Sequence, residues 1–243
     1  MDELRPEFHQ ELDDLRNDIA RLGASVVELI PRVTGVLLQQ DLEGAEYVLQ
    51  GDDEIDARSI EVEERALTLL ALQAPVAGDL RQVAAVLKLA PEIERSADLC
   101  CNICKAARRI YGHDLDPKLR GGIQRMSDQA HKEYKEVVEA YLTVDATRAA
   151  AISDMDAYLD DLHRQFISQI FESHAAGHVD LQVAVQLAVV ARFYERLGDH
   201  AVNISQRVLY IATGWLPEHD AAQRHRARQS VGADVPPGEH GEG

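Results

Sequence analysis

The sequence predicts an all-α protein made of two tandem three-helix bundles that are related by an internal repeat. Apolar residues recur at spacings of three and four, for example throughout residues 12–30, which is the period of an amphipathic helix. Aromatic residues are only 5% of the chain, and no segment alternates apolar and polar residues as a half-buried strand does. No proline lies between Pro117 and Pro217, which permits long uninterrupted helices there.

Capping and helix-breaking residues divide the chain into six predicted helices. Asp41, Asp79, Asp145 and Asp180 are placed as N-caps, and the first helix is expected to kink at Pro31. Because the connections are short, each set of three helices should form an antiparallel bundle. The expected ranges are 7–40, 41–73, 79–111, 119–142, 145–175 and 180–214.

The second half of the chain repeats the first after a shift of 101 residues. The pattern Glu-Arg-x-x-Asp at residues 94–98 falls on the same pattern at residues 195–199, and Asn102 falls on Asn203. One three-helix unit used twice explains this better than chance. The chain therefore divides into a first three-helix repeat, a second three-helix repeat and a polar tail with prolines and glycines that is predicted to be disordered: residues 1–113, 118–216 and 217–243.

The chain is strongly acidic, with 42 Asp and Glu against 25 Lys and Arg and a formal net charge of −17. Binding to nucleic acid depends on clustered Lys and Arg, so this charge argues against nucleic acid as a partner. The apolar content of 46% indicates a globular chain rather than a disordered acidic one. Neither a run of about 18 apolar residues nor a signal-peptide pattern occurs, so we expect a cytoplasmic protein that is peripheral to a membrane at most.

The repeated pattern gathers carboxylates on one face of a helix. The spacings i, i+4 and i+8 bring Glu94, Asp98 and Asn102 to nearly one side, and the same holds 101 positions later. Like charges four residues apart are mildly unfavourable by a few tenths of a kcal/mol, about the size of one helix ion pair. Their repetition in both halves suggests that something compensates the repulsion.

Antiparallel geometry adds acids from the preceding helix. Residues equidistant from a turn lie at the same height, because each helix rises 1.5 Å per residue. With the first turn centred at residue 75 or 76, Asp53 is level with Asp98, and Asp56 lies one turn further on. With the second turn centred at residue 176 or 177, Asp154 is level with Asp199.

Two cation sites follow from this arrangement, since grouped carboxylate oxygens suit a hard cation or a metal cluster. Ala157 occupies the position that corresponds to Asp56, so the second site is expected to have one acid fewer. Asn102 and Asn203 would support the sites by hydrogen bonding. The predicted ligands are Asp53, Asp56, Glu94, Asp98, Asp154, Glu195 and Asp199.

Other interpretations of these residues stay open. The acids could belong to a solvated surface, with Arg95 and Arg196 neutralising them internally. Cys101 and Cys104 have the spacing of metal ligands but lack a second Cys or His pair in the same helix. His200, beside the predicted ligands, is a further but weaker candidate.

The motifs resemble those of the PhoU family, accessory regulators of phosphate-specific transport. The most specific stretch is Leu-Leu-Ala-Leu-Gln-Ala-Pro-Val-Ala-Gly-Asp-Leu-Arg at residues 69–81, followed by Glu-Arg-Ser-Ala-Asp at residues 94–98. Residues 53–56 resemble the Asp-x-x-Asp element of the family, and residues 195–204 resemble its second motif. The resemblance covers about residues 7–214.

This sequence departs from the family pattern near the first motif. Pro91 lies inside the third predicted helix, where it is expected to kink the chain three residues before the first acid of the motif. Ser96 and Ala97 replace the usual apolar-Gly pair of the family. Both departures concern the geometry of the first predicted cation site.

The resemblance implies a function as well as a fold. It implies a cytoplasmic homodimer that is not an enzyme and that links the ATPase subunit of a phosphate ABC transporter to a sensor histidine kinase. Such a protein acts as a negative regulator, restraining uptake and the phosphate-starvation response when phosphate is plentiful. The resemblance also implies metal clusters at the two motifs, with iron or zinc as the metal and magnesium or manganese as alternatives.

Two rival functions belong to other classes. A carboxylate-based metalloenzyme, such as an oxidase or a phosphatase, needs an open ligand position and a substrate pocket as well as acids. The absence of any Glu-x-x-His pattern counts against a di-iron oxidase. A helical interaction module without metal is the second rival, and a melting curve that does not respond to added metal would favour it.

Overall fold

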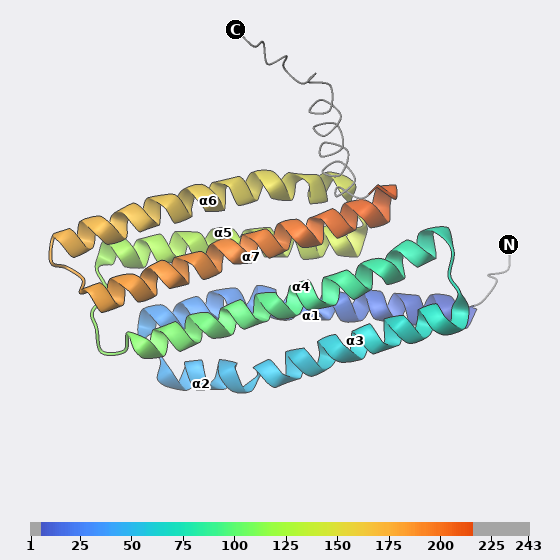
Figure 1. Ribbon diagram of the computed structural model, residues 1–243, viewed down its shortest axis with the longest axis horizontal. Helices are drawn as coiled ribbons and strands as arrows, with labels where there is room; N and C mark the ends of the chain where they lie inside the picture. The colour runs from blue at the N-terminus through green and yellow to red at the C-terminus, as the bar shows by residue number, and fades with distance from the viewer. Residues whose placement is uncertain (1–5, 216–243) are drawn as a thin grey trace, which may run out of the picture.

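The computed structural model describes residues 6–215, and within that range it contains seven α-helices and no strand (Figure 1). The all-α prediction is therefore confirmed, and the predicted disordered tail lies outside the described residues apart from its first boundary. The helices are α1 (Pro6–Gln39), α2 (Leu42–Gln50), α3 (Asp52–Gln73), α4 (Ala77–Arg109), α5 (Pro117–Thr143), α6 (Ala146–Ala175) and α7 (Leu181–Thr213).

The two repeats lie side by side and share one core. Helices α1 to α4 form the first repeat and α5 to α7 the second, and α1 packs against α5 while α4 packs against α7. The α3–α4 turn and the α6–α7 turn lie at opposite ends of the molecule (Figure 1). The two halves therefore run in opposite directions, and residues equivalent by the repeat occupy opposite sides of the α4–α7 contact.

Three of the four predicted N-caps are confirmed. The side chains of Asp41, Asp145 and Asp180 each accept a hydrogen bond from a backbone N–H in the first turn of their helix. The prediction for Asp79 is wrong, because α4 begins two residues earlier, with Val76 at the N-cap position. Asp79 instead lies in the first turn, where a carboxylate interacts favourably with the helix dipole.

The second predicted helix is in fact two helices, α2 and α3, which meet at Gly51. The Gly51 N–H donates to the carbonyl groups of Tyr47 and Val48 as α2 ends. Glycine is a weak helix former, and the acids that open α3 are stabilised by its N-terminal dipole. The break matters for function because it sets the phase of α3, on which the acids of the first cluster lie.

Pro31 and Pro91 both lie inside helices that continue past them, α1 and α4. Helix α1 is, among the described residues, the one helix long and apolar enough to cross a bilayer by length and composition. Its apolar residues pack against α4 and α5 in the shared core, so this feature does not show a membrane span.

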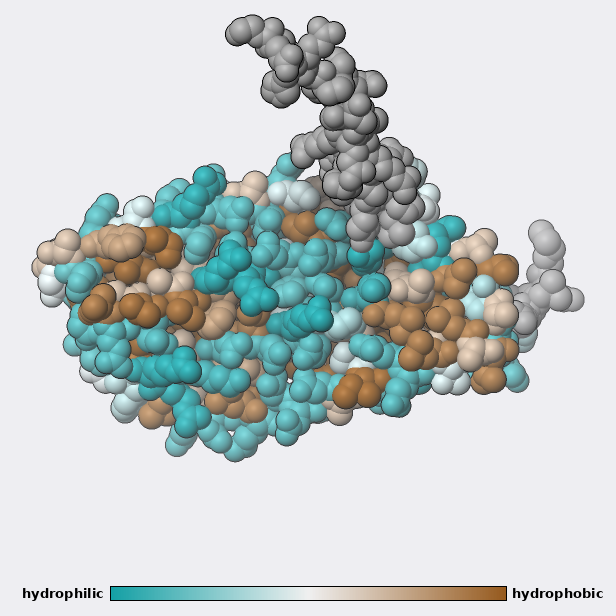
Figure 2. All heavy atoms as spheres, in the orientation of Figure 1, coloured by the Kyte–Doolittle hydropathy of each residue, from teal (hydrophilic) through white to brown (hydrophobic). Residues whose placement is uncertain are grey.

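The surface is hydrophilic along the middle of the molecule and apolar toward its two ends (Figure 2). At the α6–α7 end, the side chains of Phe171, Leu181 and Val185 are at least half exposed. At the α3–α4 end, Leu72 and Val76 are exposed to a similar degree. Each repeat therefore carries exposed apolar side chains beside the turn between its second and third helices.

Candidate functional site

The first acidic cluster lies between α3 and α4. Burial raises the pKa of Asp56, and the charges of Asp52, Asp98 and, least of all, Asp53 raise it further. Burial likewise raises the pKa of Glu94, with smaller contributions from Asp98 and Asp56. Three of the four acids predicted for this site thus act on one another, while Asp53 is exposed and Asp52, which was not predicted, takes its place.

The second acidic cluster lies between α6 and α7. Burial raises the pKa of Asp156 to about 6, and the charges of Asp160, Asp199 and Glu195 add to the shift. Burial, followed by the charge of Asp199, also raises the pKa of Glu195. Asp154 is exposed and contributes to neither shift. The expectation that this half is one acid poorer is corrected, since Asp156 and Asp160 stand where Asp52 and Asp56 stand in the first half.

The position of each turn explains why a neighbouring acid replaces the predicted one. The α3–α4 connection, residues 74–76, is centred on residue 75, so the residue level with Asp98 is Asp52. The α6–α7 connection, residues 176–180, is centred on residue 178, which brings Asp156 close to the level of Asp199. An error of one residue in a turn centre moves the partner by two residues, from one face of the helix to the other.

A fifth acid, Glu133 on α5, reaches the second cluster and was not predicted. Its side chain is fully buried, and burial raises its pKa to about 8, with the nearby charges of Asp156 and Asp160 raising it and a hydrogen bond from Gln129 lowering it. No side chain on α1 was found to contribute in this way to the pKa shifts of the first cluster. The two clusters are thus alike in their four outer acids and differ in this inner one.

Several carboxylate oxygens in these clusters are buried without a hydrogen-bond donor. They are Oδ1 of Asp56, Oδ1 of Asp156, Oε2 of Glu195 and Oε2 of Glu133. Such oxygens are the donor type that a hard cation prefers. Within residues 6–215, however, no three His, Cys, Asp or Glu side chains converge closely enough to hold one metal ion as they stand. The donors fit a cation in kind, and binding requires their side chains to rotate toward one another.

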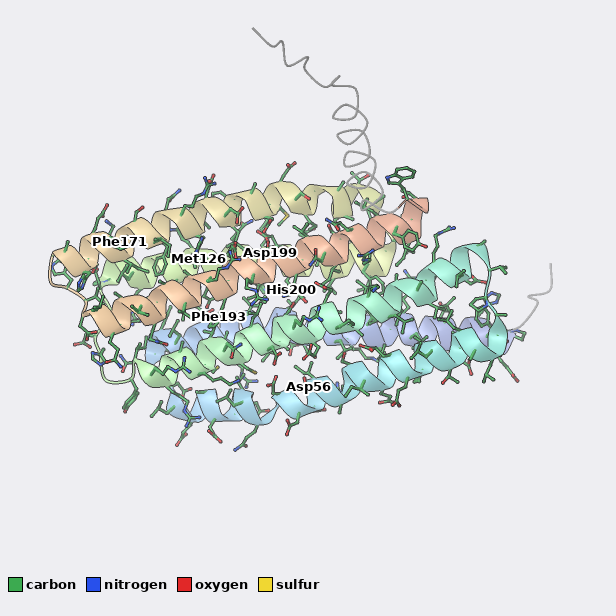
Figure 3. All side chains as sticks on the ribbon, in the orientation of Figure 1. Asp56, Met126, Phe171, Phe193, Asp199 and His200 are labelled. Atoms are coloured by element: carbon green, nitrogen blue, oxygen red, sulfur yellow. The ribbon has the colours of Figure 1, made fainter. Side chains whose placement is uncertain are left out.

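The residues expected to support the sites do something different. Asn203 donates to Oε2 of Glu92 at 2.9 Å, and Nδ1 of His200 lies 2.8 Å from the same oxygen. Glu92 is on α4 and the other two are on α7, so this contact joins the two repeats. Figure 3 shows His200 between Asp56 on α3 and Asp199 on α7. The contact therefore lies between the two acidic clusters.

The remaining predicted residues have lesser roles in the structure. Arg95 donates to Oε1 of Glu92 at 3.5 Å, whereas Arg196 is exposed and Asn102 is half-buried on α4. An arginine that was not predicted, Arg192, pairs with Glu195. The internal neutralisation weighed for Arg95 and Arg196 thus involves Arg192 in the second half.

The three cysteines are buried thiols on α4. Burial raises the pKa of Cys104 to about 12 and raises the pKa of Cys100 and Cys101 as well. The Cys101 thiol donates to Oδ1 of Asp52 at 3.2 Å, at the edge of the first cluster. At neutral pH these side chains are therefore small buried groups rather than thiolate nucleophiles.

Comparison with known proteins places both repeats in one family. The family model described as the PhoU domain matches residues 19–107 and 123–208. The phosphate-specific transport system accessory protein PhoU homolog 1 of Mycobacterium leprae is 34% identical over 92% of this chain and all of its own length. PhoU homolog 2 of Mycobacterium tuberculosis is 34% identical over 88% of this chain and all of its own length.

Solved structures of two further proteins have the same fold. The phosphate transport system regulatory protein PhoU from Streptococcus pneumoniae superimposes with a TM-score of 0.79 at 24% identity, covering 86% of this chain and 98% of its own. PhoU from Pseudomonas aeruginosa superimposes with a TM-score of 0.80 at 24% identity, covering 86% of this chain and all of its own.

Proposed function

This chain belongs to the PhoU family, and from that premise we propose that it is an accessory regulatory protein of a phosphate transport system. The observation that carries the proposal is that the PhoU domain matches the chain twice, once in each repeat. The relatives that match over nearly their whole length are named as accessory proteins of phosphate-specific transport. The same names support a regulatory rather than an enzymatic role.

The finer features of the proposal follow from the family resemblance. The protein would be a cytoplasmic homodimer that contacts the ATPase subunit of a phosphate ABC transporter and a sensor histidine kinase. It would act as a negative regulator, holding uptake and the starvation response down when phosphate is plentiful. The exposed apolar side chains beside the α3–α4 and α6–α7 turns offer surface for such contacts.

We further propose that the two acidic clusters are cation sites. The first would use Asp52, Asp56, Glu94 and Asp98, with Asp53 at its edge, and the second Asp156, Asp160, Glu195 and Asp199. Asp154 is exposed and stays outside the second site. Iron or zinc follows from the resemblance, and magnesium or manganese suits the oxygen donors.

A bound cation supplies positive charge between carboxylates that otherwise repel one another. The carboxylates would then hold α3 against α4 in the first repeat and α6 against α7 in the second. Because the α6–α7 and α3–α4 pairs also carry the exposed apolar ends, their packing sets the surface that a partner meets. Cation occupancy would in this way change the shape of the regulator without any reaction.

The test is purification of the tagged full chain from its own cells, with metal analysis of the same sample. We expect a phosphate-transport component or a sensor kinase to be recovered together with a stoichiometric metal. Asp98→Asn and Asp199→Asn should lower the metal content, whereas the exposed control Asp154→Asn should not. Recovery of neither partner would overturn the regulatory proposal.

The rival functions are outcomes of the same set of proteins. A phosphoester turned over by the purified protein, with activity lost in Asp98→Asn, would establish a metalloenzyme instead. Metal-free protein whose unfolding is unchanged by iron, zinc, manganese or magnesium would leave a helical interaction module and remove the cation sites.

A further inference from the structure

Glu133 holds a carboxylate oxygen for which the protein supplies no donor. The side chain lies on α5 and is 0% exposed. Its Oε1 accepts a hydrogen bond of 2.8 Å from Nε2 of Gln129, and that same nitrogen donates to the carbonyl of Met155 at 2.9 Å. Both hydrogens of the Gln129 amide are thus in use. Oε2 of Glu133 remains buried with no partner.

The unpartnered oxygen meets a second one across the backbone of α7. A Cβ atom placed on Gly198 would clash with Oδ1 of Asp156 and would lie 3.0 Å from Oε2 of Glu133. Both oxygens are buried and without a donor, and they come from different helices, α5 and α6. They therefore share the space that the missing side chain of Gly198 leaves open.

The first repeat lacks this inner space. The residue that corresponds to Gly198 after the shift of 101 is Ala97, which is fully buried. Its methyl group occupies the place that the two oxygens share in the second repeat. The difference cannot be a general need of the fold, because the fold is the same in both halves.

The charges near Glu133 leave the pair without compensation from the protein. The side-chain charges that act on Glu133 are those of Asp156 and Asp160, both negative. Arg192 pairs with Glu195 from the exposed side of α7. An ionised carboxylate that is buried without a positive charge costs several kcal/mol, as a typical magnitude.

We propose that Glu133 and Asp156 form the inner end of a divalent-cation site in the second repeat, with Glu195 as a further ligand. This inference rests on the proposed cation function of the second cluster and adds to it a ligand from α5 and an opening at Gly198. All donors are carboxylate oxygens, so the site takes a hard cation of the Mg²⁺ and Mn²⁺ class. The first cluster, which has a thiol at its edge and Ala97 in place of glycine, lacks this inner position.

The experiment titrates the metal-stripped full chain with Mn²⁺ and counts free Mn²⁺ by its paramagnetic resonance signal. Glu133→Gln keeps the shape of the side chain and its bond from Gln129, and removes the charge. We expect Mn²⁺ to bind the second cluster at least about tenfold more weakly in this variant, since loss of even an outer-shell partner typically costs 10–100-fold. The exposed acid on α6 gives the control, Asp154→Asn, which should bind as the natural chain does.

Thermal unfolding gives a readout that is independent of counting. Without metal, Glu133→Gln should melt at the same temperature as the natural chain or higher, because the buried oxygen loses its charge. With Mn²⁺, the natural chain should gain in melting temperature and the variant should gain clearly less. A structural role alone would lower the stability of the variant in both conditions, and that result would overturn the inference.

The outcomes separate this inference from the function on which it rests. If the natural chain binds no Mn²⁺, the inner site falls, and the cation proposal is then judged on the metal found in cells. If the natural chain binds Mn²⁺ and Glu133→Gln binds it within twofold, only the inner site falls, and the two oxygens share a proton instead. Gly198→Ala should weaken binding as Glu133→Gln does, and if it fails to fold, the Glu133→Gln result alone decides.

Discussion

Replacing Glu92 by alanine should destabilise the protein, although the residue lies only two positions from an acid whose removal should have the opposite effect. Oε2 of Glu92 accepts from Nδ1 of His200 and from Asn203, at 2.8 and 2.9 Å. An ionised carboxylate can only accept, so the imidazole proton must lie on Nδ1. Burial alone would raise the pKa of Glu92, but these hydrogen bonds and the charges of His200 and Arg95 lower it.

The size of the effect follows from these contacts. Two hydrogen bonds to a charged acceptor contribute about 3 kcal/mol together, at the lower end of the range for such bonds. Deleting a carboxylate that is 18% exposed recovers roughly 1 kcal/mol of its desolvation cost. We therefore expect Glu92→Ala to lower the free energy of unfolding by about 2 kcal/mol.

Glu94→Ala is the matched control, since it removes the same atoms from the same helix. Burial and the charges of Asp98 and Asp56 raise the pKa of Glu94, so in metal-free buffer its removal should increase stability by a few tenths of a kcal/mol. Urea denaturation at pH 7 measures both values. A Glu92→Ala protein within 0.5 kcal/mol of the natural chain would refute the reasoning, as would two variants that change stability in the same direction.

Three further predictions concern other buried groups. Thr34→Val should lose about 1–3 kcal/mol in urea denaturation, because the hydroxyls of Ser127 and Tyr194, at 2.6 and 2.7 Å from Thr34 Oγ1, lose their shared partner. Thr68→Val, which removes an exposed bond within one helix, should cost less than 0.5 kcal/mol, and equal losses would contradict the prediction. The pKa of Glu133 lies near 8 in the folded protein against 4.5 as its ordinary value, so the folded state binds more protons in that window. In chelator-treated samples the stability of the natural chain relative to Glu133→Gln should therefore fall as pH rises from 5 to 8, by at most about 1.4 kcal/mol per unit, and a constant difference would rule this out. The three buried thiols of α4 should not react with a thiol reagent in the native protein and should all react in guanidinium, so a thiol titrated at once at pH 8 would count against their burial.

The helices could be predicted from the sequence because apolar spacing and capping residues are local signals. The exception is the break at Gly51, where the apolar pattern continues through α2 and α3 with no proline to mark an end. The N-cap at Val76 was missed for a related reason, since no side chain caps α4 and the chain offers a more typical cap at Asp79. Each failure occurs where the backbone, rather than a side chain, satisfies the helix terminus.

The acids of the third helix in each repeat could be predicted because they recur in the sequence. Their partners on the preceding helix could not, since these depend on where each turn is centred. The α6–α7 connection has five residues against three in the α3–α4 connection, so a single shift of 101 residues aligns α4 with α7 but not α3 with α6. Asp52 and Asp56 correspond to Asp156 and Asp160 only after a shift of 104.

Glu133 carried a signal of a different kind. The core positions of α5 follow one another at alternating spacings of four and three, and all of them are buried: Leu119, Ile123, Met126, Ala130, Glu133, Val137 and Ala140. A single carboxylate thus occupies a position where the pattern calls for an apolar side chain. Burying an acid there is unfavourable unless something satisfies it, and the fold supplies one donor for two oxygens. An acid at a core position of an otherwise apolar stripe therefore indicates a ligand from outside the chain more specifically than the many acids on its surface do.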